Sequence, residues 1–379
     1  MPVHEEFQKL RTSLDRDRKE ILDRFLERHS KECEQSVRDE IDSDKRHVAI
    51  INLIAFAFSE SGPLRSTGYH FMKTEPLFRY RAQEGNKIFD IVLYSQKTKR
   101  AVLVEVKSSI EEPRRDALLP LKDQIANARN HLHELENEVT GEINDLEYVI
   151  CGPPQDVEEI GKKLHNDDPA CLWSADIQYS TLKIFNPTGT TNSERTAELI
   201  RKRQLNIDPD LREKMYGKTK SQGQMGIRVL TTSHICRMLS RTIAGITQRF
   251  LLNTSSDERR FWMHELISVL MDEIPGTPAE DLDRIAKEII ALAIKLRIVE
   301  LEPSLTNPSE SSYKLKVGTR TPKTIEDFVE GQYIKQICEE NSPMMAIQEF
   351  REFVKKDIGT LDQIFSSLNQ DKPDIQKKE

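Results

Sequence analysis

Apolar positions near the start of the chain recur with a helical period. The first stripe consists of Phe7, Leu10, Leu14, Ile21 and Phe25. Spacings of three, four and seven residues place these side chains on one face of a helix. Because the stripe is short, we expect this helix to dock on the body of the protein rather than to form a coiled coil. The run VAIINLIAFAF at 48–58 then predicts a buried helix, which ends at the Ser-Gly-Pro sequence of 61–63.

The period changes to that of strands in the next part of the chain. Strands are predicted at 77–83, 87–94 and 101–107, and the short turns between them indicate antiparallel neighbours. The following elements alternate between helix and strand: a helix at 111–138, a buried strand at 146–152, a helix at 156–167 and one or two strands at 171–185. The expected fold class is therefore α/β, with the element order of an αβββαβ sandwich.

Beyond residue 187 the pattern predicts a separate, mainly helical domain. A long helix running into a strand at 297–303, followed by a second strand at 312–317, is typical of a winged helix. Trp173 and Trp262 are both expected to fill cores. The expected segments are a charged helical segment at 1–44, an α/β domain at 45–187, a basic linker at 188–226, a winged-helix-like domain at 227–320 and a helical tail at 321–379.

Composition indicates a globular protein and narrows its partners. Hydrophobic residues make up 37% of the 379 residues and charged residues 31%, and no apolar run is long enough to span a membrane. Five scattered cysteines without metal-type spacing, and a start without a signal region, favour a cytoplasmic protein. The net charge is −7, yet 194–249 holds twelve Lys or Arg against five Asp or Glu. Such a local excess suits a nucleic-acid partner as well as an ordinary solvated face.

Three charges interrupt the apolar strands, and they carry the chemical argument. Glu105 and Lys107 lie two residues apart and therefore share one face of a strand, while Asp90 lies on the preceding strand. Two acids within sheet core cost several kcal/mol unless a cation or hydrogen bonds compensate them. Mg²⁺ takes hard oxygen ligands and stabilises charge that develops on a phosphodiester. This set predicts phosphodiester hydrolysis, whereas a surface salt bridge is the simpler alternative.

These residues resemble the PD-(D/E)xK nuclease superfamily, which has the restriction-endonuclease-like fold with an αβββαβ core. Phe89-Asp90 stands where the family has Pro-Asp, and Glu105-Val106-Lys107 is the only Glu-x-Lys in the sequence. The resemblance implies that Asp90, Glu105 and the backbone carbonyl of Val106 hold Mg²⁺, or Mn²⁺, and that Lys107 is the catalytic lysine. It covers less than half of the chain, and the proline is missing.

Weaker candidates surround this motif. The family often adds an acid from the helix before the strands and a polar residue from the helix after them. The weaker candidates are Glu60 or Glu75 as the added acid, Gln124 as the polar residue, and Arg79, Arg81, Lys218 and Lys220 as DNA contacts. Each of them is also compatible with an ordinary solvated position.

We expect the protein to be a Mg²⁺-dependent DNA endonuclease of restriction or genome-defence type. We also expect a homodimer, because cutting two strands needs two active sites. Three alternatives stay open. They are a structure-specific repair or recombination nuclease, an RNA nuclease, and a non-catalytic winged-helix DNA-binding factor.

Overall fold

The chain divides into two compact units. The structure is a computed structural model that describes residues 3–74, 89–107, 125–126, 128–163, 170–185, 198, 208–216, 235–252, 259–273, 279–303, 312–317 and 322–370. The first unit combines Met1–Glu40 with Thr324–Glu379, and the second unit comprises Ile41–Lys323. The two ends of the chain therefore fold together, although the sequence predicted them as separate segments.

The first unit is built from three helices. They are α1 (Val3–Ser13), the N-terminal part of α2 (Arg16–Ala57) and α11 (Pro322–Gln370). The apolar stripe predicted near the N-terminus packs against α11 through Ala346, Ile347 and Phe350. The stripe therefore packs against another helix of the chain, but its partner is the C-terminal helix rather than the expected body of the protein. Helix α2 also runs unbroken through residue 44, where the sequence predicted a boundary.

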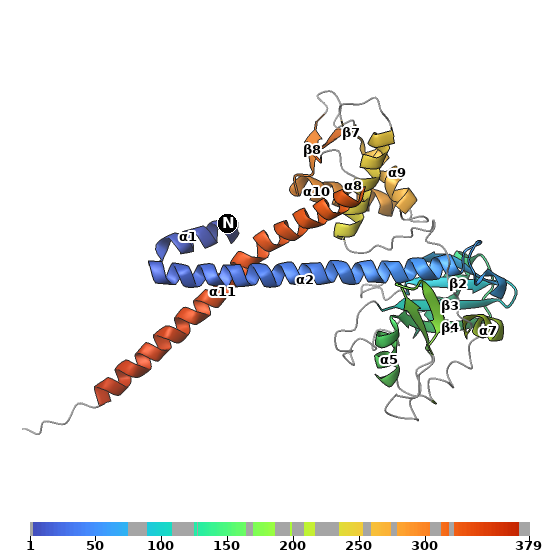
Figure 1. Cartoon of the computed structure of the whole chain (residues 1–379), viewed down its shortest axis with the longest axis horizontal. Coiled ribbons are helices and arrows are strands. Elements are labelled where there is room, and N and C mark those ends of the chain that lie inside the picture. Colours follow the sequence, from blue (N-terminus) through green and yellow to red (C-terminus); the bar gives the residue numbers. More distant parts are fainter. Residues whose placement is uncertain are drawn as a thin grey trace, which may run out of the picture. The chain divides into compact units, whose positions relative to one another are not determined.

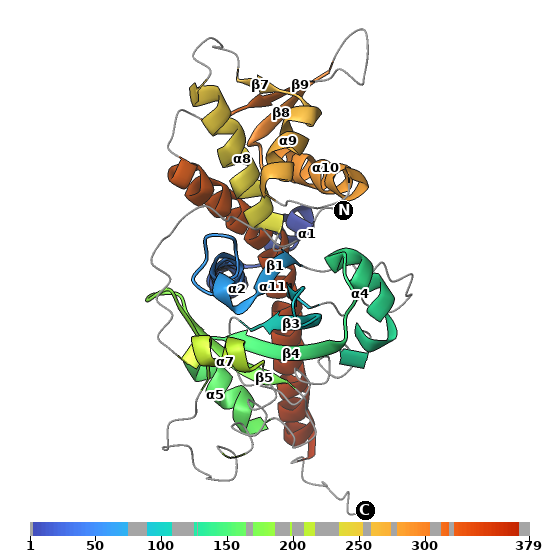
Figure 2. The same cartoon turned by 90° about the vertical axis from the view of Figure 1, so that its right-hand side faces the viewer.

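The second unit contains a six-stranded sheet whose strands lie in chain order (Figures 1 and 2). The strands are β1 (Tyr69–Thr74), β2 (Ile91–Ser95), β3 (Arg100–Val106), β4 (Asp145–Gly152), β5 (Cys171–Asp176) and β6 (Thr181–Ile184). Strands β1, β2 and β3 are antiparallel neighbours, β3, β4 and β5 run parallel, and β6 returns antiparallel to β5. The mixed α/β class is confirmed by this sheet.

Helices cover both faces of the sheet, because alternate side chains of the central strands point into two cores. On one face, Val102 and Val104 join Ile50 and Ile54 of α2 and residues of α7 (Pro209–Tyr216). On the other face, Leu103 belongs to the core formed with α4 (Leu132–Val139) and α5 (Pro154–Lys163). Strand β4 is buried from its third residue onward, as its apolar sequence predicted.

The rest of the second unit is a helical module with a small sheet. Its elements are α8 (Ile235–Leu252), β7 (Arg260–Phe261), α9 (Met263–Glu273), α10 (Ala279–Lys295), β8 (Val299–Glu302) and β9 (Ser312–Leu315). The predicted helix that leads into a two-stranded ribbon is present as α10, β8 and β9, and β7 adds a third antiparallel strand. Trp262 is 43% exposed, so its prediction as a core residue is wrong, whereas Trp173 is buried as expected.

Two predicted elements fall largely outside the described residues. The predicted strand at 77–83 lies there, and the first strand that the structure describes is β1 at Tyr69–Thr74. Most of the helix predicted at 111–138 also lies there, and α4 begins at Leu132. Within the described residues, none of the helices combines the length and apolar character that crossing a membrane requires.

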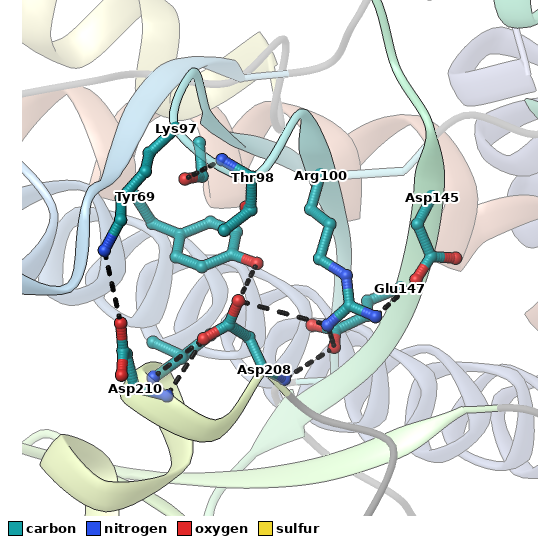
Figure 3. Close-up of polar contacts among 10 residues, drawn as sticks. Tyr69, Lys97, Thr98, Arg100, Asp145, Glu147, Asp208 and Asp210 are labelled. Atoms are coloured by element: carbon teal, nitrogen blue, oxygen red, sulfur yellow. Dashed lines mark hydrogen bonds and ion pairs between the residues drawn. The ribbon is translucent and has the colours of Figure 1, made fainter.

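A buried polar cluster joins α7 to the start of β3 and β4 (Figure 3). Arg100 of β3 contacts Asp145 at 2.6 Å and Glu147 at 3.5 Å, and both acids belong to the adjacent strand β4. The Tyr69 hydroxyl donates to Asp208 at 3.3 Å, and the Asp208 backbone N–H donates to Glu147 at 2.9 Å. Arg100 thus lies within 4.0 Å of carboxylate oxygens of Asp145, Glu147 and Asp208, and the last two of these acids are buried.

This cluster explains how α7 begins. Asp208 accepts hydrogen bonds from the backbone N–H groups of Asp210, at 2.9 Å, and Leu211, at 3.4 Å, which is the arrangement of a helix N-cap. Pro209 occupies the first helical position, where its missing N–H has no cost. Glu147 then holds the cap residue against the sheet, so the cluster anchors α7 over the core.

Burial raises the pKa of Glu147 to about 7, against opposing effects of Arg100 and the Asp208 N–H. A carboxyl whose pKa is higher in the folded than in the unfolded chain stabilises the fold at low pH, and that contribution is lost as pH rises to the folded pKa. We predict that Glu147→Gln, which mimics the protonated acid, gains about 2–3 kcal/mol in stability relative to the unmodified chain as pH rises from about 5 to about 8.

Urea unfolding of the sheet measures this prediction. The chain has two tryptophans, so a Trp262→Phe background makes fluorescence report on buried Trp173 alone. Glu159→Gln, at an exposed glutamate of α5, is the matched control and should shift the unfolding midpoint equally little at both pH values. A Glu147→Gln effect that is independent of pH would contradict the prediction.

Candidate functional site at the end of β3

Asp90 lies just before β2 and is bound to the backbone of β3. Its N–H donates to the Val104 carbonyl at 3.0 Å. Its carboxylate oxygen Oδ2 accepts the N–H of Val106 at 2.6 Å. The carboxylate thus takes the place of a strand carbonyl at the point where the pairing of β2 and β3 ends. This contact places Asp90 beside the residues that flank Val106 in the chain.

Those flanking residues are Glu105 and Lys107, and their head groups meet. The Lys107 ammonium donates to Glu105 Oε1 at 2.5 Å. The side chain of Glu105 is 10% exposed and that of Lys107 is 33% exposed, so the pair lies at the edge of the core. The predicted acid, acid and lysine are therefore brought together at one end of β3.

The end of β4 positions the backbone of Lys107. The Lys107 N–H donates to the Cys151 carbonyl at 2.8 Å. A Cβ atom at Gly152 would lie 2.6 Å from the Lys107 carbonyl oxygen, so a residue with a side chain does not fit there. The parallel pairing of β3 with β4 thus continues as far as the lysine and holds it in place.

His47 of α2 completes the group, and the sequence analysis missed it. Its Nε2 atom lies 3.2 Å from Asp90 Oδ1. Burial works to lower the pKa of His47, but the hydrogen bond and charge of Asp90, followed by the charges of Asp44 and Glu105, outweigh burial and raise that pKa. His47 therefore gains a proton more readily than a free histidine does, and its positive form pairs with the acids.

A second ion pair lies one helical turn before His47. Asp44 contacts Arg237 of α8 at 3.2 Å, with side chains that are 14% and 13% exposed. Residues three apart on a helix lie on the same side, so Asp44 and His47 both face away from the solvated side of α2. The only signal in the sequence was a cluster of polar residues just before the apolar run at 48–58, and such clusters usually mark a helix surface.

Glu60 does not join this group. Helix α2 passes Asp90 at His47, and the ten helical residues from there to its end at Ala57 correspond to roughly 15 Å. Glu60 is exposed beyond the end of α2, where its backbone carbonyl accepts a hydrogen bond from Arg65. The other weaker candidates lie outside the described residues: Glu75, Arg79, Arg81, Gln124, Lys218 and Lys220.

The donor atoms fit a hard divalent cation in kind. Asp90 and Glu105 supply carboxylate oxygens from neighbouring segments, and Mg²⁺ is commonly held by one or two carboxylates together with water. Among the described residues, however, no three or more His, Cys, Asp or Glu side chains are arranged as a ready metal site. Glu105 contacts Lys107 and Asp90 contacts His47, so a cation would have to replace or share these contacts.

Comparison with known proteins adds no further information about this group. No protein family, no curated protein and no solved structure matches the chain. The chemistry of the site therefore has to be inferred from the residues themselves.

The contact between Asp90 and Val106 has a consequence for stability. Asp90→Ala removes the acceptor of a partly buried N–H, and we predict a loss of about 1–2 kcal/mol in the free energy of unfolding. Asp90→Asn keeps an oxygen at that position and should cost clearly less. Urea unfolding of both variants measures the difference, with Glu60→Ala as the exposed control. Equal losses for Ala and Asn would show that the hydrogen bond does not contribute.

Proposed function

We propose that this chain is a divalent-cation-dependent nuclease that hydrolyses phosphodiester bonds of DNA. The observation that carries the proposal is the convergence of Asp90, Glu105 and Lys107 at one end of β3. Two acids beside one amine suit a reaction in which negative charge grows on a phosphate. An isolated surface salt bridge would not require a second acid bound to the same strand.

Asp90, Glu105 and the backbone carbonyl of Val106 are the groups that would hold Mg²⁺ or Mn²⁺. The cation, when bound, lowers the pKa of a water molecule and neutralises charge on the phosphate. Lys107 then orients the attacking water or stabilises the pentacovalent phosphate through its ammonium group. His47 keeps the Asp90 carboxylate in position, as partners of metal ligands commonly do.

The order of elements supports the resemblance to PD-(D/E)xK nucleases. Helix α2, strands β1 to β3, helix α4 and strand β4 follow one another as αβββαβ. Phe89, at the position of the family's proline, is buried and packs against Tyr148 with ring centroids 5.8 Å apart. A large apolar residue thus fixes the start of β2 by packing, so the proline is not needed to position Asp90.

DNA is the proposed substrate, and the helical module is proposed to be a winged helix from its order of α8, β7, α9, α10, β8 and β9. Helix α10 corresponds to the helix that reads the major groove in such modules. It carries four acids against three bases, and Arg284 and Lys287 are paired within the helix. This balance of charges on α10 does not favour contact with the phosphates of DNA. We therefore propose that the basic residues of 194–249, rather than α10, attract the duplex.

The biological setting follows from the proposed activity. A separate module beside a cutting domain suits restriction or genome defence, and cutting both strands suits a homodimer. The apolar N-terminal stripe is packed against α11 of the same chain, so the proposed dimer contact lies elsewhere.

Cleavage of plasmid DNA tests the activity. We predict that Asp90→Asn and Lys107→Met each lower the rate at least about a hundredfold, because each removes a group that acts on the reacting phosphate. The Asn variant is preferred because it keeps the hydrogen bond to Val106. Lys97→Met is the matched control, because Lys97 lies in the turn between β2 and β3 and its side chain is 77% exposed. This variant should retain the activity of the unmodified chain.

The substrates separate the alternatives. Plain duplex, forked DNA, single-stranded DNA and RNA of the same sequence are compared with Mg²⁺, with Mn²⁺ and with EDTA. Preference for forks indicates a structure-specific nuclease, and preference for RNA indicates an RNA nuclease. Binding of DNA without any cleavage, or full activity of Lys107→Met, would refute the proposed catalytic role.

His47 gives a second, independent test. We predict that His47→Gln raises the Mg²⁺ concentration needed for half-maximal cleavage by roughly tenfold or more, because Asp90 loses the group that orients it. The rate at saturating Mg²⁺ should change less. His133→Gln is the control, because the His133 side chain is 86% exposed. An unchanged Mg²⁺ dependence would show that His47 does not position the ligand.

A further inference from the structure

Two cysteines that are far apart in the sequence meet in the first unit. Cys33 lies on α2 and Cys338 on α11, and 305 residues separate them. Their sulfur atoms are 2.9 Å apart, with the Cys338 thiol donating to the sulfur of Cys33. Both residues are only partly buried, whereas Cys151, Cys171 and Cys236 are buried. The pair therefore differs from the other cysteines in its contact and in its exposure.

The packing around the pair holds the two helices in a defined register. Phe25 of α2 contacts Phe353 of α11 with ring centroids 6.2 Å apart. One turn further along α2, His29 lies 2.7 Å from Glu349, and Cys33 follows another turn later. Along this line the partners on α11 have lower residue numbers, so the two helices run in opposite directions where they meet.

A cavity lies beside the thiol pair, and Cys338 forms part of its wall. It has a volume of about 360 Å³, and its walls include Cys338, Ser30, Glu34, Arg38 and Lys335. A water molecule occupies about 30 Å³ of liquid, so a molecule the size of hydrogen peroxide fits in this space. Cys338 therefore both lines the cavity and contacts the sulfur of Cys33.

We propose that Cys33 and Cys338 form a redox-active pair that a peroxide converts into an intramolecular disulfide between α2 and α11. The thiolate of Cys33 attacks one peroxide oxygen, the O–O bond breaks, and a sulfenic acid and hydroxide form. The sulfur of Cys338 then attacks the sulfenic sulfur and releases water, and the proton of the first thiol neutralises the hydroxide. In total, two thiols are oxidised to a disulfide and one peroxide is reduced to two waters. A thiol reductant cleaves the disulfide again and restores both thiols.

The two cysteines have different parts in this sequence. Burial, together with the hydrogen bond to Cys33, raises the pKa of Cys338 to about 12. Cys338 therefore stays protonated near neutral pH, and its S–H group donates a hydrogen bond to the sulfur of Cys33. Cys33 is thus the first nucleophile. Because the second step needs the Cys338 thiolate, oxidation becomes faster as pH rises. A sulfur–sulfur bond of about 2.05 Å requires only a small further approach of the two helices.

The bond would link the two ends of the chain covalently. The apolar contacts of α1, α2 and α11 hold the first unit together without it. A cross-link between residues so far apart in sequence removes much of the freedom of the unfolded chain, so the oxidised first unit resists unfolding more than the reduced one. This inference does not depend on the proposed nuclease activity.

Thiol mapping of the full chain tests the pair. The unmodified chain and the Cys33→Ala, Cys338→Ala and Cys236→Ala variants are treated with hydrogen peroxide while folded. Free thiols are then alkylated in denaturant, and peptides are identified by mass spectrometry. We expect the unmodified chain to lose two of its five thiols and to yield one linked peptide pair containing Cys33 and Cys338. Cys236→Ala, at a buried cysteine of the second unit, should form the same link.

The remaining arms decide the mechanism. Cys33→Ala and Cys338→Ala should form no link, and dithiothreitol should restore both thiols of the unmodified chain. The link should form several times faster at about pH 9 than at about pH 7. The proposal is overturned if all five thiols survive peroxide treatment, or if the linked peptides come from two chains in a concentration-dependent way. A rate that does not rise with pH would overturn the assigned role of Cys338.

Discussion

Strand β3 is buried along nearly its whole length, and its charges therefore have to be compensated within the protein. Arg100 stands at its first position, and Glu105 and Lys107 stand at and just beyond its other end, with apolar residues between them. A charge in such a setting costs several kcal/mol unless it finds a partner. The pairing of β3 with β2 and β4 decides which partners are within reach, and the two polar clusters of the sheet both follow from that pairing.

The two clusters solve the same physical problem in different ways. At the start of β3, Arg100 contacts Asp145 and Glu147, and the backbone N–H of Asp208, the cap residue of α7, donates to Glu147. The groups of this cluster hold an element in place. At the other end, the described partners of Asp90 and Glu105 include His47, a backbone N–H and a partly exposed lysine. In the proposed reaction a cation and a phosphate would take over some of these contacts, and for this reason we propose the chemistry at this end.

The first unit shows a different constraint, in which the ends of the chain complete one another. The apolar stripe of α1 and α2 is too narrow and too short to form a core by itself. Helix α11 supplies the missing apolar face through residues such as Ile347 and Phe350. Charged contacts, including that of Arg11 with Asp23, frame this core. The same packing brings Cys33 to Cys338, so the thiol pair is a consequence of how the core is completed.

The sequence by itself determined the local features of this protein. Alternation and apolar runs were enough to predict β2, β3, β4, the helix at 48–58 and the ribbon of β8 and β9, because these signals depend on neighbours in the chain. The same pattern identified Asp90, Glu105 and Lys107, since charges within apolar strands stand out. The proximity of Asp90 to Glu105 could also be anticipated, because one short turn joins their strands.

Only the tertiary structure decided which distant residues join these groups. His47 and Arg100 carry no unusual signal in sequence, because their roles depend on helix α2 crossing the sheet and on the parallel neighbour β4. Trp262 has the composition of a core residue, yet it is exposed because Phe261 takes the inward side of the short strand β7. The pairing of α2 with α11 and the meeting of Cys33 with Cys338 span most of the chain. Local periodicity holds no information about contacts at that separation, and packing alone selects them.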